Sequence, residues 1–247
     1  MLIPRIFHQI WVGPDPFPEE FAPYQETWLG LNPGWELRLW TEENLPDDLE
    51  RKEAYERLRQ PAERADVLRL ELLYRQGGVY VDVDFECLRA IEPLLEDVDV
   101  FVARPKRRRI NNAIMGSVPR HPLLARAVRE IEPRSTFGPV DKARTGPLFL
   151  RRLLRDYPEV TIFEPDVFFP RTPEARQHAY ADHHQAGTWK DARKLGKQLQ
   201  GAQRQLREAQ DEAHQWRTMF ERAEADLARL KTGSSSVVRL RQLFARK

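Results

Sequence analysis

The chain has 247 residues, of which 41% are hydrophobic and 32% are charged, and its formal net charge is +2. This composition suits one globular domain with a solvated extension, and the small net charge gives no reason to expect a nucleic-acid partner. The single cysteine, Cys87, excludes a disulfide within the chain and is typical of a reducing compartment.

The sequence shows no targeting segment. It has no run of about 18 apolar residues, so we expect no transmembrane helix. Residues 1–5 are not followed by the apolar stretch and cleavage site of a signal peptide. We therefore expect a cytoplasmic protein, with peripheral contact to the inner face of the membrane as a further option.

Residues 1–189 alternate short apolar runs with turn signals and amphipathic helices. Strands are expected at Ile3–Val12, Trp35–Trp40, Val79–Asp84, Val98–Ala103 and Val160–Glu164. Helices are expected from Pro61 to the Gly77-Gly78 pair, at Pro122–Ile131 and at Pro147–Tyr157. This alternation predicts an α/β fold with a mostly parallel sheet flanked by helices, in which ligands bind beyond the carboxyl ends of the strands.

The composition changes beyond residue 189, where proline is absent. Apolar residues then alternate at spacings of four and three, at Leu195, Leu199, Ala202, Leu206, Ala209, Ala213, Trp216, Phe220, Ala223, Leu227 and Leu230. This heptad pattern predicts a coiled-coil helix over residues 190–231 that joins copies of the chain into a homo-oligomer. A single solvated helix is the alternative. Residues 232–247 are expected to form a flexible basic tail suited to peripheral membrane contact.

The most informative motif runs from Gly77 to Asp84 and contains two aspartates, Asp82 and Asp84. Side chains alternate along a strand, which predicts that Tyr80 and both aspartates share one face. Two neighbouring carboxylates repel unless a cation lies beside them. Mg²⁺ or Mn²⁺, bridging to a diphosphate, would provide that charge with oxygen ligands. The alternative is an edge strand whose acids face water.

Several separated motifs together resemble glycosyltransferase family 32, whose sugar-binding region contains an Asp-x-Asp motif. They are Ile3–Trp11, Ala65–Arg69, Leu73-Tyr74, Gly77–Asp84, Asn111–Ala113, Thr145–Pro147 and Tyr180–Trp189. The family includes fungal initiating mannosyltransferases and bacterial capsule enzymes, with glucosylating clostridial toxins as distant relatives. The resemblance implies a GT-A-like domain over residues 1–189. It also implies retaining transfer of a sugar from a nucleotide-diphosphate donor to a glycan, lipid-linked or protein acceptor.

The resemblance also implies a metal site and catalytic residues. Asp84 would bind the divalent cation directly, and Asp82 would contact both the donor and the metal environment. Either His183 or His184 would complete the metal site, with a slight preference for His184; two exposed loop histidines are the alternative. Arg69 would join the two aspartates in catalysis, which would stabilise the leaving diphosphate without a covalent nucleophile.

The implied donor-binding residues are Ile10, Trp11, Asp66, Arg69, Tyr80, Asp82, Asn111, Asn112 and Trp189. Ile10 and Trp11 would form a platform for the nucleobase, with core packing as the alternative. Asp66 and Arg69 would engage the ribose and sugar phosphate, with an intrahelical salt bridge as the alternative. Asn111 and Asn112 would contact sugar hydroxyls, or else form a turn. A uridine donor is expected over a guanosine donor, because the toxin relatives place a tryptophan like Trp11 against uracil.

Two other functions compete with sugar transfer. A metal-dependent phosphohydrolase would also use paired aspartates, and a coiled-coil scaffold could carry a non-catalytic sugar-nucleotide-binding head. The absence of an N-terminal anchor favours a bacterial-type enzyme, and hence polysaccharide biosynthesis. The basic run 106–109 is either a solvated loop or a site for a phosphate-bearing acceptor.

Overall fold

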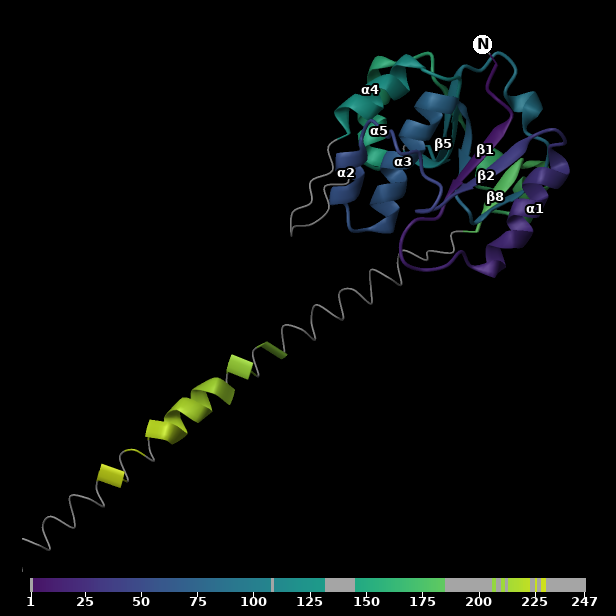
Figure 1. Ribbon diagram of the computed structural model, residues 1–247. Helices are drawn as coiled ribbons and strands as arrows, with labels where there is room; N and C mark the ends of the chain where they lie inside the picture. The colour runs from purple at the N-terminus through teal and green to yellow at the C-terminus, as the bar shows by residue number, and fades with distance from the viewer. Residues whose placement is uncertain are drawn as a thin grey trace, which may run out of the picture. The chain divides into compact units, whose positions relative to one another are not determined.

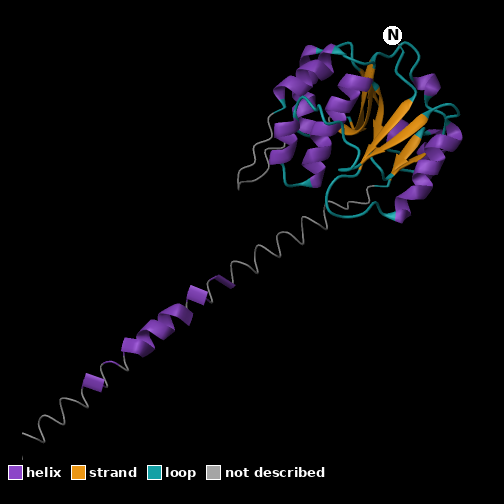
Figure 2. Cartoon of the chain, in the orientation of Figure 1, coloured by secondary structure: helices purple, strands orange, loops and turns teal. Residues whose placement is uncertain are grey.

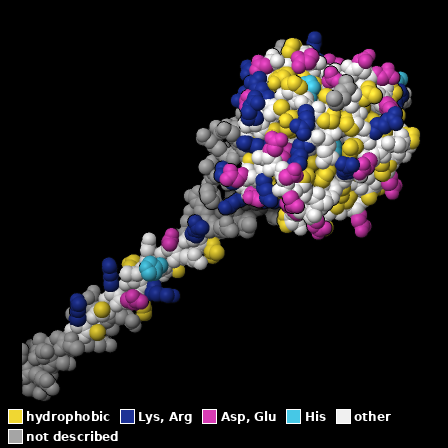
Figure 3. Space-filling model, turned by 45° about the horizontal axis from the view of Figure 1, so that its top comes forward, with side chains coloured by type: hydrophobic (Ala, Val, Ile, Leu, Met, Phe, Trp, Pro, Cys, Tyr) yellow, Lys and Arg dark blue, Asp and Glu magenta, His cyan; other side chains and the backbone are white. Residues whose placement is uncertain are grey.

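The computed structural model describes residues 2–107, 109–131 and 145–184, and beyond them residues 206–207, 210–211, 213–222, 225 and 228–229. The chain divides into two compact units, residues 1–186 and 187–247. On the face of the first unit shown in Figure 3, acidic and basic side chains are interspersed, in keeping with the small net charge.

A six-stranded sheet forms the centre of the first unit (Figures 1 and 2). Its strands, in spatial order, are β2 (Glu36–Trp40), β1 (Ile6–Ile10), β3 (Gly78–Val81), β6 (Arg109–Ser117), β5 (Val100–Lys106) and β7 (Thr161–Phe163). β1 is parallel to β2 and β3, and β5 is parallel to β7. β6 is antiparallel to both neighbours, because it returns from β5 through a tight hairpin. The sheet is therefore mixed, and one reversed strand interrupts the mostly parallel arrangement that we predicted.

Helices cover both faces of this sheet (Figure 1). They are α1 (Ala22–Leu31), α2 (Lys52–Arg57), α3 (Pro61–Gln76), α4 (Pro122–Glu130), α5 (Pro147–Leu153), α6 (Pro165–Phe168) and α7 (Pro173–His178), with 3-10 helices η1 (Glu19–Phe21), η2 (Glu92–Leu94) and η3 (Leu154–Asp156). A separate two-stranded sheet pairs β4 (Phe85–Cys87) with β8 (Ala181–His183). The helices predicted from Pro61, Pro122 and Pro147 are confirmed; α1, α2, α6, α7, β4, β6 and β8 were not predicted.

The central strand β3 is buried on both faces. Tyr80 packs into the hydrophobic cluster beneath α3, α4 and α5, whereas Val79 and Val81 pack into the opposite cluster with Trp28 of α1. β3 also has a hydrogen-bonded strand on each side. The structure thus excludes the alternative of an edge strand whose acids face water, because β3 is an interior strand of the six-stranded sheet.

Helix α3 is held against the start of β3 by a buried histidine. Trp40 Nε1, which can only donate, lies 3.1 Å from His8 Nδ1, so Nδ1 accepts and the ring proton is on Nε2. Nε2 then donates to the carbonyl of Gly77, at 2.9 Å. Burial lowers the pKa of His8 to about 4, against the raising effect of the Gly77 bond and with nearby Arg38 lowering it further. His8 is therefore neutral in the folded protein.

We expect His8 to make stability fall with acidification. Its folded pKa of about 4 is below the unfolded value near 6.5, so only the unfolded chain binds this proton as the pH falls from about 6.5 to about 4. The stabilisation of the folded state by neutral His8 should be fully present above pH ~6.5 and smaller by roughly 2 kcal/mol at about pH 5. Urea unfolding at about pH 7 and about pH 5 measures this change in the free energy of unfolding.

The buried carboxyl groups of Asp66, Glu71 and Asp82 have raised pKa values, so they add stability as the pH falls, opposite to His8. The effect of His8 is therefore measured by comparing how the free energy of unfolding depends on pH in the wild type and in His8→Gln. The variant should be less stable at neutral pH, because it loses the neutral ring, and it should lack this acid-dependent loss. An equal pH slope in both proteins would show that His8 does not titrate as proposed.

The second unit is described only in part. All of its described residues are helical, and among them Leu206, Trp216 and Phe220 are 59%, 69% and 66% exposed. The coiled coil, the homo-oligomer and membrane contact stay predictions, and the basic tail and residues 190–205 lie outside the described residues. Within the described parts of the chain, no helix combines the length and hydrophobicity needed to cross a membrane.

Candidate active site

Asp82 and Asp84 lie just beyond the carboxyl end of β3. The strand ends at Val81, three residues earlier than predicted, and both aspartates lie in the turn that leads into β4. The Asp82 amide donates to Ala113 of β6 at 2.8 Å, and the carbonyl of Asp82 accepts from Phe85 at 3.2 Å. The prediction that both acids lie on one strand face was therefore wrong: the closed turn, and not strand alternation, brings them together.

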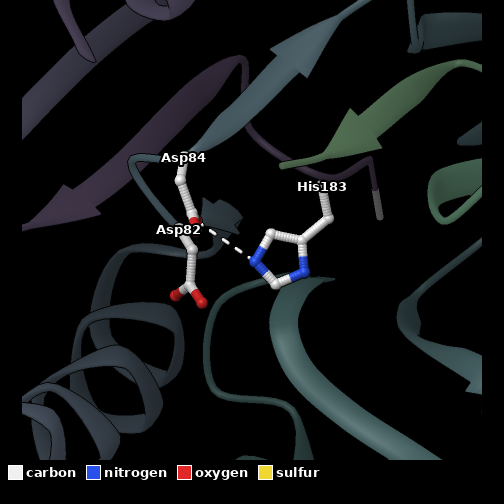
Figure 4. Close-up of side chains that lie close together, drawn as sticks. All are labelled: Asp82, Asp84 and His183. Atoms are coloured by element: carbon white, nitrogen blue, oxygen red, sulfur yellow. Dashed lines mark hydrogen bonds and ion pairs between the residues drawn. The ribbon is translucent and has the colours of Figure 1, made fainter. Parts of the chain in front are cut away.

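Three side chains meet at this turn in an arrangement suited to a metal ion. Potential ligand atoms of Asp82, Asp84 and His183 all lie within 4.8 Å of one another. Figure 4 shows the His183 ring facing Asp84, with Asp82 beside them, and Nε2 is 3.1 Å from Asp84 Oδ1. Two carboxylates and an imidazole are suitable ligands for Mn²⁺, and the carboxylates for Mg²⁺.

The pairing of β4 with β8 delivers His183 to the aspartates. Phe85 is opposite His183 in this antiparallel pair, and the two rings stack with centroids 4.3 Å apart. Phe169 contacts the same imidazole edge-on, at 5.7 Å. The side chain of His183 is only 12% exposed, so aromatic packing holds its ring in a defined orientation.

His184 lies elsewhere. Its Nε2 is 2.9 Å from Glu86 Oε2, and its ring stacks on Tyr24 of α1 at 4.7 Å. Successive side chains of an extended chain point in opposite directions, so His183 and His184 cannot both face the aspartates. The structure favours His183, against the slight sequence-based preference for His184, and the packing of His183 does not fit an exposed loop histidine.

A buried arginine links helix α3 to the aspartate turn. Arg69 is 6% exposed, and its guanidinium lies 3.3 Å from Asp66 Oδ1 and 3.4 Å from Asp82 Oδ1. It also donates to the carbonyl of Asn112 and lies over the ring of Tyr80, 4.3 Å from its centroid. The Asp66–Arg69 pair is thus more than an intrahelical salt bridge, because the same guanidinium group also contacts Asp82.

Asp66 accepts hydrogen bonds from two other segments. Asn112 Nδ2 donates to Oδ1 at 2.7 Å, and the Thr145 hydroxyl lies 3.4 Å from Oδ2. Burial raises the pKa of Asp66, and Arg69 opposes that rise. Thr145 was not among the predicted site residues, although it begins the Thr-Gly-Pro motif that contributed to the family resemblance; that motif was the available signal.

Asp82 is in a similar environment. Burial raises its pKa, with Arg69 as the largest opposing influence. The hydroxyl of Tyr80 donates to Asp82 Oδ1, and burial raises the pKa of Tyr80 well above its usual value. Tyr80 is therefore a fixed hydrogen-bond donor that orients the Asp82 carboxylate.

The other predicted donor-binding residues differ in their placement. Trp11 follows β1 at the same edge of the sheet, where its ring lies 5.9 Å from Phe17 and 6.0 Å from Phe21. Ile10 is buried in the core, which agrees with the core-packing alternative. Asn111 lies within β6, opposite Ala103 at an irregularity of the strand pairing. Its side chain accepts from the Ala113 amide at 2.9 Å, so the predicted turn is not observed and the sugar contact stays a prediction. Trp189 lies outside the described residues.

Comparison with known proteins finds relatives of this region. Residues 18–111, which include both aspartates, match the family model described as a glycosyltransferase sugar-binding region containing a DXD motif. Inositol phosphoceramide mannosyltransferase 3 of Schizosaccharomyces pombe is 31% identical over 204 residues, covering 77% of this chain and 56% of the relative. A mannosyl phosphorylinositol ceramide synthase of Saccharomyces cerevisiae is 32% identical over 165 residues, covering 63% of this chain and 43% of the relative. The chain thus spans about half the length of these curated relatives.

Solved structures share the fold. The PaToxG glycosyltransferase superposes with a TM-score of 0.50 at 16% identity, covering 63% of this chain and 69% of that one. The glycosyltransferase domain of the YGT toxin gives 0.50 at 12% identity, covering 66% and 80%. At these identities the likeness concerns the fold alone, and it agrees with the predicted GT-A-like α/β domain.

Proposed function

The chain carries the DXD-containing sugar-binding region of a glycosyltransferase family, and from this premise we propose that it transfers a sugar from a nucleotide-diphosphate donor to an acceptor. The observation that carries the proposal is the convergence of Asp82, Asp84 and His183 beside the buried Arg69–Asp66 pair. A scaffold would not need buried charges to be held in this way, since burial of ionised groups is costly unless they are paired.

We propose that Asp82, Asp84 and His183 hold Mn²⁺ or Mg²⁺, which would supply positive charge to the leaving diphosphate. Arg69 and Tyr80 fix the orientation of Asp82. Asp66, with Asn112 and Thr145 as its partners, offers a carboxylate to donor hydroxyls. The retaining transfer that we predicted is part of this proposal: the acceptor would attack on the face that the diphosphate leaves, without a covalent nucleophile.

The acceptor and the biological setting also belong to this proposal. The relatives are named for transfer to inositol phosphoceramide, so a lipid-linked acceptor is the first to test, ahead of glycans and proteins. These relatives are fungal, and the bacterial polysaccharide setting and the cytoplasmic location stay predictions. The preference for a uridine donor rests on Trp11, which lies at the edge of the sheet where the aspartates are, and thermal unfolding with nucleotides tests it.

Thermal unfolding with paired ligands tests donor and metal together. We expect uridine diphosphate with Mn²⁺ to raise the melting temperature, because the diphosphate supplies oxygen ligands in addition to those of Asp82 and Asp84. At about 100 times its dissociation constant, a ligand adds about 2.7 kcal/mol, which is a shift on the order of 5–10 °C for a domain of this size. Either ligand alone should produce much less.

The same samples distinguish the alternatives. A shift with guanosine but not uridine diphosphate would reverse the donor preference, and a shift that ignores Mn²⁺ would remove the metal site. Product analysis separates transfer from phosphohydrolysis: a transferase incubated with a nucleotide sugar releases the nucleoside diphosphate and free sugar. A phosphohydrolase would instead cleave the bond between the two phosphates and release the nucleoside monophosphate and the sugar 1-phosphate.

A further inference from the structure

The hairpin that joins β5 to β6 presents a group of basic side chains. Lys106 is paired with Arg109 at its tip, and Lys106, Arg107 and Arg109 are all exposed. Within the parts of the chain that the structure describes, none of the three lies within 4.0 Å of a carboxylate oxygen, although Arg107 is near enough to Glu164 to help lower its pKa. Other arginines of the same unit do; Arg126, for example, contacts both Glu130 and Asp156.

This basic tip lies at the catalytic edge of the sheet. β6 runs antiparallel to β3 with Val81 opposite Ile114, and the Asp82 amide then bonds to Ala113. Residues 109–112 therefore extend beyond the end of β3, on the side where the aspartates lie. Arg109 is three residues from Asn112, whose carbonyl accepts from Arg69, a span of about 10 Å along an extended strand.

Two further arginines hold the hairpin backbone in place. Arg104 donates to the carbonyl of Arg107 at 3.0 Å and pairs with Glu164. Arg171 donates to the carbonyl of Pro105, also at 3.0 Å. Arg104 and Arg171 therefore have a structural role, because both bind the backbone of the hairpin. Lys106, Arg107 and Arg109 have no such role, and their charges are exposed on a fixed backbone.

We infer that Lys106, Arg107 and Arg109 bind a phosphate group of the acceptor while the acceptor hydroxyl lies at the aspartate turn. The inference rests on the proposed sugar transfer, and it names the acceptor as a phosphate-bearing molecule. We assign the donor diphosphate to the metal ligands and the hairpin, which is offset from them along β6, to the acceptor. Guanidinium and ammonium groups are the side chains that bind phosphate oxygens most strongly.

Binding of the full-length chain to vesicles tests the inference. Vesicles of phosphatidylcholine with phosphatidylinositol should bind the protein, and vesicles of phosphatidylcholine alone should not. The triple variant Lys106→Glu, Arg107→Glu, Arg109→Glu should lose affinity for the first on the order of 100-fold. The matched control is Arg129→Glu, Arg151→Glu, Arg155→Glu, which makes the same charge change at exposed sites on α4, α5 and η3 and should lose less than about fivefold.

A competition arm identifies the source of the phosphate. Release of the protein by soluble inositol phosphate would show that the headgroup phosphate itself is bound, whereas hairpin-dependent binding that resists it would show that the lipid surface is required. Equal vesicle affinity of the hairpin variant and wild type, or an equal loss in the control variant, would overturn the inference.

Donor hydrolysis keeps the two proposals apart. Both triple variants should retain the metal-dependent hydrolysis of nucleotide sugar measured without acceptor, because neither alters the aspartate turn. A wild type without this hydrolysis would contradict the proposed function, and the vesicle comparison would still decide whether the hairpin binds phosphate.

Discussion

Replacing Asp84 with alanine should lower the rate of sugar transfer on the order of 1,000-fold while the protein stays folded. Asp84 contributes one of the three converging ligand groups and lies 3.1 Å from His183. Without it, two ligands remain for a cation that prefers six or more oxygen or nitrogen donors. The site should then fail to hold the charge that stabilises the leaving diphosphate. Transfer of radiolabelled sugar, measured with Mn²⁺, gives the rate.

Two controls separate loss of metal from loss of fold. Asp182 lies beside His183 in β8 but contacts Arg176 at 3.5 Å, so Asp182→Asn should retain activity within about tenfold. Both variants should unfold within a few degrees of wild type, about the shift that 1 kcal/mol produces. Chelation should silence the wild type, and added Mn²⁺ should restore it. Activity of Asp84→Ala close to that of wild type, or full activity in chelator, would refute the metal mechanism.

Replacing Arg69 with methionine should destabilise the first unit by about 3–5 kcal/mol, because it removes one partner of a buried ion pair. Methionine fills much of the same volume, so the expected loss is electrostatic. Asp66 and Asp82 would each lose the guanidinium at 3.3 and 3.4 Å, and the Asn112 carbonyl would lose its donor. Urea unfolding gives the change in the free energy of unfolding.

A second substitution tests whether uncompensated charge is the cause. In the background of Arg69→Met, Asp66→Asn should recover part of the lost stability, because it neutralises one of the two stranded carboxylates. Arg57 is a useful control: its pair with Glu53 is exposed, so Arg57→Met should change stability little. If Arg69→Met proves as mild as Arg57→Met, the buried network does not stabilise the fold in the way described.

The amino-acid sequence alone predicted the elements whose signals are local. Proline at the first position and glycine after the last residue bound α3 as expected. The apolar runs of β1, β2 and β7 also lie where predicted. The motif from Gly77 to Asp84 predicted a divalent-metal site, and with the separated motifs it predicted a resemblance to a glycosyltransferase family whose sugar-binding model matches residues 18–111. The element boundaries need only side-chain periodicity and capping, and the metal-site prediction rests on the repulsion between two neighbouring acids. The family rests on the resemblance of the separated motifs.

Tertiary structure decided the partners of each site residue. His183 rather than His184 faces the aspartates because of the register of β8 against β4, two strands separated by more than ninety residues of sequence. Asn112 reaches Asp66 while the side chain of Asn111 bonds to the Ala113 amide within β6, and the placement of β6 beside β3 decides which asparagine meets Asp66. No local pattern encodes such pairings, because strand register depends on hydrogen bonds and packing between segments that are distant in the chain.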